Sequence, residues 1–429
     1  MSNDDVIESD VVVVGGGLAG LTAGAVAAGE GARVTVIEAH RRGGRARTSD
    51  VGSARFNQGA HALYRHGSGW KVLASLGIEP TGGPPAIAAA RGLCGDELAI
   101  LPIGPMGLAR TSLLGAKGKI HFGKLMTKLA KLDATTLAGQ SLRTWFDEQD
   151  VDERVRALVT ALARVSTYDP DPASLPADLA VRQVQLGSTG VLYLDGGWQQ
   201  LVDALNERCA QRGAHVLERD QVTEITNDGS GRWHVRTGGG THVAANAVVI
   251  AAGGPAACRS LLAATPPPPA WSAVGPDIVA SCLDIAASRE AGPPILFGVD
   301  VPLYLSTHCP PAQLAPKGTT IVHVMRYGGA AEPAAGRAEL TALAGRVGLD
   351  ESVISEQRYL HRMTVIHGRP DVERGLAGRS PVAVGDRDGL FVAGDWVGPE
   401  GWLADASLSS GEAAGLLAAA HARLGAQGR

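Results

Sequence analysis

The sequence predicts an α/β fold built on a parallel sheet, together with a second domain of mixed type. Three observations support this prediction. Val11–Val14 is a β-branched run of the kind that forms a strand buried on both faces. After a glycine turn, Leu18–Ala28 consists mainly of small residues, as in a helix packed closely on a sheet. A second apolar run, Val34–Ile37, ends in an acidic residue, Glu38.

The glycines between the first strand and the helix form the pattern G-x-G-x-x-G. Gly15 allows the tight turn, Gly17 lets a pyrophosphate approach the backbone, and Gly20 lets the helix pack on the strand. In a dinucleotide site of this kind, the helix N-terminus faces the phosphates of the ligand, and an acid at the position of Glu38 accepts hydrogen bonds from its ribose. The alternative is a tight turn without a ligand. The order strand, glycine turn, helix, strand and acid favours a Rossmann-like dinucleotide site.

The residues after Glu38 indicate which dinucleotide is bound. Gly43-Gly44-Arg45 follows the acidic strand end directly. With these residues the sequence resembles the flavoprotein superfamily of amine oxidases, phytoene desaturases and protoporphyrinogen oxidases, in which the glycine pair and the arginine continue the FAD site. The spacer from Glu38 to the glycine pair is one residue shorter than the usual pattern of that superfamily.

A second match to the superfamily lies near residue 400. The segment Gly389–Trp396 begins as an apolar strand and ends with Gly394-Asp395-Trp396. A loop and an alanine-rich helix follow. The resemblance implies that Asp395 meets the pyrophosphate or the ribityl chain. It also implies that the helix beginning near Leu403 points its N-terminus at the flavin pyrimidine, where negative charge gathers on reduction.

The resemblance therefore implies FAD and a set of residues that bind it. The set is Gly15, Gly17, Leu18, Ala19, Gly20, Glu38, Ala39, Gly44, Arg45, Gly59, Ala60, His61, Val222, Ala252, Gly253, Gly394, Asp395 and Leu403. We expect the FAD to be non-covalent because the closing segment contains no cysteine. His61 and His66 keep attachment through a histidine open.

Length and composition limit the remaining possibilities. A chain of 429 residues is too long for one ordinary core and suggests two domains. The net charge of -4 gives no reason to expect nucleic acid. No apolar run approaches the ~20 residues that span a bilayer, and the first residues do not resemble a signal peptide, so we expect a cytoplasmic protein. Five scattered cysteines without a C-x-x-C pair predict neither a disulfide framework nor a metal site.

We predict two discontinuous domains. The FAD-binding domain takes residues 1–78, 190–264 and 381–429, and the substrate-binding domain takes residues 79–189 and 265–380. The second domain is expected to be α+β, with a mixed sheet that roofs the flavin and a helical cap.

A basic segment stands out within the predicted cap. Five of the seven lysines of the chain lie between Lys117 and Lys131, and apolar residues recur there at helical spacing. A basic amphipathic helix can lie on an anionic membrane surface. The alternative is a solvated helix that covers the substrate-binding domain. The oligomeric state, monomer or dimer, stays open.

No nucleophile or metal cluster is evident, and none is needed, because the flavin accepts the hydride. The catalytic candidates are His61, Tyr64, Tyr304, His361 and Trp402. Many amine oxidases of the superfamily carry an aromatic residue at the position that aligns with Leu403, and a lysine beside the flavin. Here the only lysine after Lys131 is Lys317. These two differences weaken the resemblance to amine oxidases. The sequence Ala-Gly-Asp-Trp around Asp395 is more similar to the desaturase and protoporphyrinogen-oxidase branch.

The resemblance thus implies an FAD-dependent oxidoreductase that dehydrogenates a small, largely apolar molecule. The first alternative is oxidation of an amine or amino acid. A second is a non-enzymatic carrier similar to Rab-GDP-dissociation inhibitors, which share the fold. The intact motifs around Glu38, Arg45 and Asp395 argue against the carrier. A flavin used without net redox chemistry also stays open.

Overall fold

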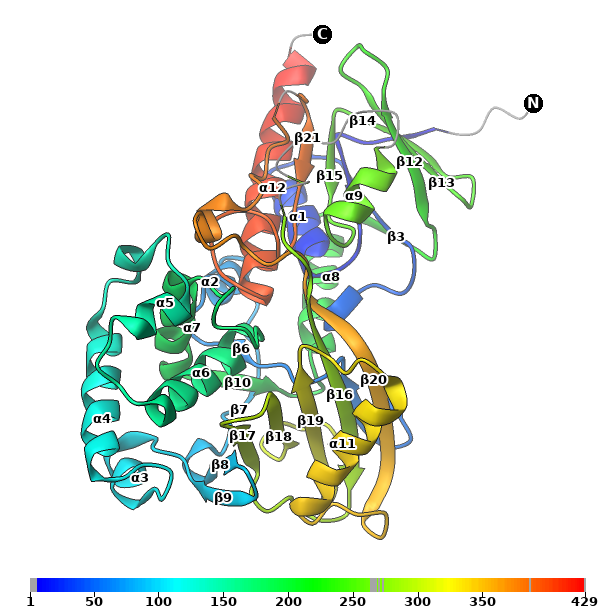
Figure 1. The fold of residues 1–429 in the computed structure, drawn as a ribbon. Helices are drawn as coiled ribbons and strands as arrows, with labels where there is room; N and C mark the ends of the chain where they lie inside the picture. The colour runs from blue at the N-terminus through cyan, green and yellow to red at the C-terminus, as the bar shows by residue number, and fades with distance from the viewer. Residues whose placement is uncertain (1–5, 263–267, 269–270, 272–273, 386, 428–429) are drawn as a thin grey trace.

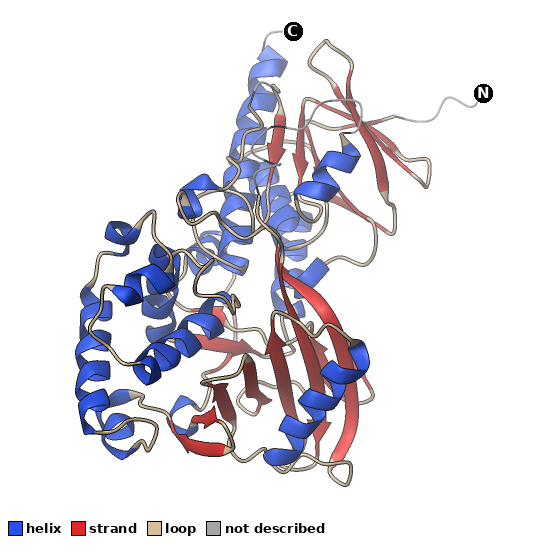
Figure 2. Cartoon of the chain, in the orientation of Figure 1, coloured by secondary structure: helices blue, strands red, loops and turns tan. Residues whose placement is uncertain are grey.

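The computed structural model describes residues 6–262, 268, 271, 274–385 and 387–427. Two large sheets organise the chain, as Figures 1 and 2 show. A five-stranded parallel sheet lies near both ends of the described chain, and a seven-stranded mixed sheet lies at the opposite end of the molecule. The α/β class predicted from the sequence is confirmed.

The parallel sheet carries the predicted dinucleotide motif. Its order is β11 (His215–Glu218), β3 (Val34–Glu38), β2 (Val11–Val14), β15 (Ala247–Ile250) and β21 (Leu390–Val392). The four valines of β2 are buried, as a central strand covered on both faces requires. Helices α1 (Leu18–Gly29), α8 (Gln199–Gln211) and α12 (Ala404–Gln427) pack on one face.

The other face of the parallel sheet is covered by α9 (Pro255–Leu261) and by a four-stranded sheet. That sheet has the order β1 (Ile7–Glu8), β14 (His242–Ala245), β13 (Trp233–Thr237) and β12 (Val222–Asn227). Smaller elements connect the two halves of the molecule. They are β4 (Thr48–Val51), β5 (Ala54–Asn57), β6 (Leu63–Tyr64), α2 (Ser68–Ser75), β7 (Gly82–Gly83) and β10 (Val191–Leu194).

The seven-stranded sheet is mixed, as predicted, because one parallel pair joins antiparallel neighbours. Its order is β20 (Ile354–Ile366), β16 (Ile278–Ala287), β19 (Thr320–Tyr327), β18 (Leu303–Cys309), β17 (Ile295–Gly298), β8 (Arg91–Cys94) and β9 (Glu97–Ile100). Helix α11 (Pro333–Arg346) packs its buried leucines on one face.

A helical layer packs against the opposite face, and the two share one apolar core. This layer contains α3 (Gly104–Arg110), α4 (Ala116–Lys131), α5 (Leu142–Asp147), α6 (Glu153–Thr167) and α7 (Ala177–Ser188). No helix in the described ranges is long and apolar enough to cross a bilayer. The predicted domain boundaries stay predictions.

Candidate functional site

A cavity of about 780 Å³ runs from the parallel sheet to the inner face of the seven-stranded sheet. At one end it is lined by the residues that follow β2 and β3, and at the other by β18 and β20. Each predicted cofactor-binding residue lines this cavity except Gly20 and Gly59. The sequence prediction and the cavity therefore coincide at one site.

The three motif glycines have different surroundings. Gly15 has φ +110°, and a Cβ there would lie 2.5 Å from the carbonyl oxygen of Ala251. A Cβ at Gly20 would lie 1.8 Å from the carbonyl oxygen of Gly15, so only glycine lets α1 pack this closely. A Cβ at Gly17 would meet nothing within 4 Å. The backbone at Gly17 is thus open to a ligand at the N-terminus of α1.

Glu38 is held at the end of β3 by the backbone. Its Oε2 accepts the N–H of Gly16 at 2.6 Å, and its Oε1 accepts the N–H of His40 at 2.9 Å. Glu38 lines the cavity, and its contact with a ribose hydroxyl stays a prediction.

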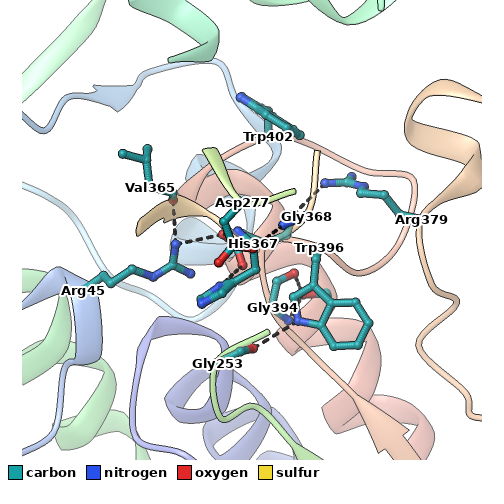
Figure 3. Close-up of polar contacts among 12 residues, drawn as sticks. Arg45, Gly253, Asp277, Val365, His367, Gly368, Arg379, Gly394, Trp396 and Trp402 are labelled. Carbon is teal, nitrogen blue, oxygen red and sulfur yellow. Dashed lines mark hydrogen bonds and ion pairs between the residues drawn. The ribbon is translucent and has the colours of Figure 1, made fainter. Parts of the chain in front are cut away.

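Asp395 joins segments that are far apart in the sequence. Its Oδ2 accepts hydrogen bonds from Arg45 Nη1 at 2.8 Å and from the N–H of His367 at 2.9 Å, and its Oδ1 lies 3.1 Å from His367 Nδ1. Figure 3 shows the side chains of Arg45 and His367 lying close to one another. Burial alone would raise the pKa of Asp395, but the Arg45 guanidinium and His367 hold it well below the usual range. Asp395 is therefore a fixed anion within the cavity wall.

The segment at Gly59 places an imidazole on the cavity wall. His61 Nδ1 donates to the carbonyl oxygen of Gly59 at 3.0 Å, since a carbonyl can only accept. The His61 ring packs edge-on against Trp198, with ring centroids 5.0 Å apart. Burial lowers the pKa of His61 to about 4, so the ring is neutral at pH 7. This neutral form leaves the lone pair of Nε2 free to accept.

Phenol rings line the end of the cavity farthest from the glycine turn. Tyr64, Tyr168, Tyr193 and Tyr304 all lie on its wall. Tyr168 donates to the carbonyl oxygen of Ala60 at 2.5 Å, and Tyr193 is hydrogen-bonded to Tyr304. Burial raises the pKa of each of these tyrosines, so the phenols stay neutral.

Comparison with known proteins identifies the family of this chain. The profile described as flavin containing amine oxidoreductase matches residues 18–276. The chain belongs to this family. FAD is thus its cofactor, and the protein is an FAD-dependent oxidoreductase. The glycine cradle, Glu38 and the buried Asp395 are groups that fit a dinucleotide.

Solved structures share the fold of this flavoprotein. An oxidoreductase from Methanosarcina mazei has a TM-score of 0.74 at 17% identity, covering 94% of this chain and 98% of that one. Putrescine oxidase bound to putrescine has a TM-score of 0.71 at 16% identity, covering 96% and 99%. A Rab GDI from Plasmodium falciparum has a TM-score of 0.60 at 11% identity, covering 96% and 97%. No curated protein sequence matches.

The catalytic candidates of the flavoprotein separate in the structure. His61, Tyr64 and Tyr304 line the cavity, whereas His361 is exposed beside Tyr359 and does not. Trp402 also does not line the cavity. It is 1% exposed, belongs to the core below the helical layer, and donates from Nε1 to the carbonyl oxygen of Thr167 at 3.1 Å. We therefore retain only the three cavity residues as candidates.

Two further predictions can be placed. Leu403, which aligns with the aromatic position of amine oxidases, lines the cavity and has φ +55°, a backbone conformation that is strained for leucine. Lys317 and His66 are exposed and absent from the cavity lining. The described cavity wall contains no lysine and no cysteine.

Sequence reasoning missed several residues of the wall. His367, Tyr168, Tyr193 and His308 line the cavity but are not among the site residues predicted from the sequence. His308 stacks on Tyr193 with ring centroids 3.7 Å apart. The strand alternation of β18 was the available signal, since Tyr304 and His308 share one face of that strand.

One group of potential metal ligands meets within the described residues, at Cys282, Asp284 and His323. His323 Nδ1 lies 2.6 Å from Oδ1 of Asp284, and Oδ2 of Asp284 accepts two bonds from Arg358 at 2.9 and 2.6 Å. Burial would raise the pKa of Asp284, but His323 and then Arg358 lower it. Both carboxylate oxygens are thus occupied, so the group is better described as a buried ion-pair network behind the cavity.

Asp405 lies in the first turn of α12 on the cavity wall, and its Oδ1 accepts the N–H of Gly69 at 3.2 Å. Burial raises its pKa to about 7. The native state therefore binds this proton more tightly than the unfolded chain, and the stability gained below the unfolded pKa is lost as pH rises to about 7.

In pH-dependent unfolding of the apoprotein, we expect Asp405→Asn to gain stability over the wild type progressively between about pH 4 and pH 7. A gain independent of pH would contradict this assignment.

Proposed function

We propose that this oxidoreductase dehydrogenates a small, largely apolar molecule at the tyrosine-lined end of the cavity. The observation that carries the proposal is the apolar character of that wall, where Val165, Met363 and Leu403 accompany the four phenols and Asp405 is the acidic neighbour of Tyr64. An anionic substrate group would find no lysine or arginine there, because the arginines of the wall, Arg45 and Arg47, belong to the dinucleotide end. When bound, FAD accepts a hydride from a substrate C–H bond.

The residues of the wall would position the substrate and exclude water. The hydroxyl of Tyr168 donates to the carbonyl oxygen of Ala60, and the hydroxyl of Tyr64 donates to that of Ser166 at 3.4 Å, so both rings are held in place. Dehydrogenation also releases a proton from the substrate. Nε2 of His61 is an acceptor on the wall that could hold this proton. We propose that the cavity-lining residues named from the sequence bind the FAD.

A second candidate is oxidation of an amine. The faces of tyrosine rings attract cations, and four such rings line one end of the cavity. Putrescine oxidase, which shares the fold, is bound to putrescine in its solved structure. A carrier without redox chemistry, similar in fold to Rab GDI, is less well supported, because Gly17, Glu38 and Asp395 retain the geometry of a dinucleotide site.

The test is an anaerobic visible spectrum of the FAD-loaded protein mixed with polyenes, porphyrinogens and amines in turn. We expect the oxidised flavin band to bleach with a neutral apolar compound and not with putrescine. In the same assay, Tyr304→Phe and Tyr193→Phe should slow bleaching about 3- to 10-fold, because each removes one hydrogen bond between neutral groups. Bleaching by amines alone would overturn the apolar proposal.

A further inference from the structure

Positive charge is concentrated in one part of the sequence. Between Glu97 and Asp133 the chain has no acidic residue, although its net charge is -4. The same stretch contains six permanent cations, which are Arg110, Lys117, Lys119, Lys124, Lys128 and Lys131. Such segregation is typical of a surface that meets a polyanion.

Helix α4 presents these lysines outward. Phe122, Leu125 and Leu129 are buried in the core that the helical layer shares with the seven-stranded sheet. Lys117, Lys124, Lys128 and Lys131 are exposed. Lys119 is half-buried and donates to the carbonyl oxygen of Ala109, and Lys128 donates to Gln149. None of the five lysines forms an ion pair with a described residue. The apolar side of α4 thus covers the protein itself, and its exposed lysines are not held in ion pairs with described residues.

Exposed apolar side chains lie on α4, on the neighbouring helix α3 and just before α3. Ile120 on α4 is 58% exposed, Met106 on α3 is 69% exposed, and Ile103 before α3 is 37% exposed. A shallow groove of about 570 Å³ lies between the helices, lined by Leu108, Lys119, Ile120, Gly123, Lys124 and Thr127. Uncompensated lysines beside exposed aliphatic groups are the combination that binds a charged membrane surface.

We propose that this surface, formed by α3 and α4, binds an anionic lipid bilayer peripherally. A nucleic acid is the other large polyanion, but its binding sites use arginine and exposed aromatic rings. Arg110 is the single arginine among the six cations of this surface. The aromatic side chains of α4, Phe122 and His121, are respectively buried and half-buried. Figure 1 shows α4 at the outer edge of the helical layer, away from the parallel sheet. The proposal does not depend on the substrate of the enzyme.

The test is co-sedimentation of the FAD-loaded protein with vesicles of phosphatidylcholine, with and without phosphatidylglycerol. We expect sedimentation only with phosphatidylglycerol, weakening as salt is raised. Lys124→Gln/Lys131→Gln should lower the partition coefficient about 30-fold, at about fivefold for each lysine. The matched control is Lys71→Gln/Lys317→Gln, which removes two exposed lysines elsewhere and should change nothing.

A second pair of variants tests the apolar contribution. Ile120→Ser and Met106→Ser should each weaken vesicle binding, whereas Leu424→Ser, which changes a 70% exposed residue near the far end of α12, should not. Equal binding to pure phosphatidylcholine, equal losses in both lysine variants, or tighter binding to duplex DNA than to vesicles would overturn the proposal. The flavin-bleaching assay contains no vesicles, so the membrane proposal and the proposed function can be contradicted independently of each other.

Discussion

Asp395→Asn is expected to leave a folded protein that retains FAD about 100-fold less tightly. The substitution removes the charge that holds Arg45 at 2.8 Å and weakens both bonds to His367. Buried hydrogen bonds to charged groups contribute about 1.5–3 kcal/mol each, and about 2.7 kcal/mol corresponds to a 100-fold change in affinity. The measurement is the dissociation constant of FAD, obtained from quenching of flavin fluorescence on binding.

The control for this variant is Asp50→Asn. Asp50 also pairs with an arginine, Arg55, but its side chain is 80% exposed and lies outside the cavity lining. It should bind FAD like the wild type. Circular dichroism of both variants separates loss of FAD from loss of fold. A folded Asp395→Asn protein with wild-type affinity would show that Asp395 does not organise the FAD site.

Asp284→Ala is expected to destabilise the protein by about 3–5 kcal/mol, the usual cost of leaving a buried charge unpaired. The substitution strands Arg358 and His323 behind the cavity. Arg358 also donates to the carbonyl oxygen of Asn57, so the segment that carries His61 should loosen with it. The free energy of unfolding in urea, measured on the apoprotein, gives the effect.

Two companion variants sharpen this experiment. Asp284→Leu/Arg358→Met replaces the pair by apolar groups and should recover much of the lost stability, because it removes the stranded charge together with its partner. Asp96→Ala breaks the ion pair with Arg346 at the surface and should change stability little. If Asp284→Ala were as mild as Asp96→Ala, the network would not contribute to stability.

Local sequence was sufficient for the dinucleotide end of the site. The strand at Val11–Val14, the glycine turn and Glu38 follow one another within one βαβ unit, so short-range pattern determines their arrangement. Resemblance extended the prediction to Asp395 and Leu403, which also lie on the cavity wall. Whether the whole set binds FAD stays a prediction.

The substrate end could not be read in the same way. Asp284 and Arg358 are 74 residues apart, and Tyr168 reaches Ala60 across 108 residues. A strand pattern predicts two alternating faces, but the packing of the helical layer decides which face meets the cavity. The same long-range packing buries Phe122 and leaves Lys124 outside, which the amphipathic pattern of α4 alone could not decide.

The ion pair between Arg45 and Asp395 also bears on how the protein matures. Its two members are separated by 350 positions, and β21 enters the parallel sheet only when the residues near 390 have been made. A ribosome that has produced the glycine turn, Glu38 and Arg45 has therefore built only part of the cofactor cradle. Flavin can be locked in place only after residue 395 has emerged, so its capture should follow the folding of the first βαβ unit rather than accompany it.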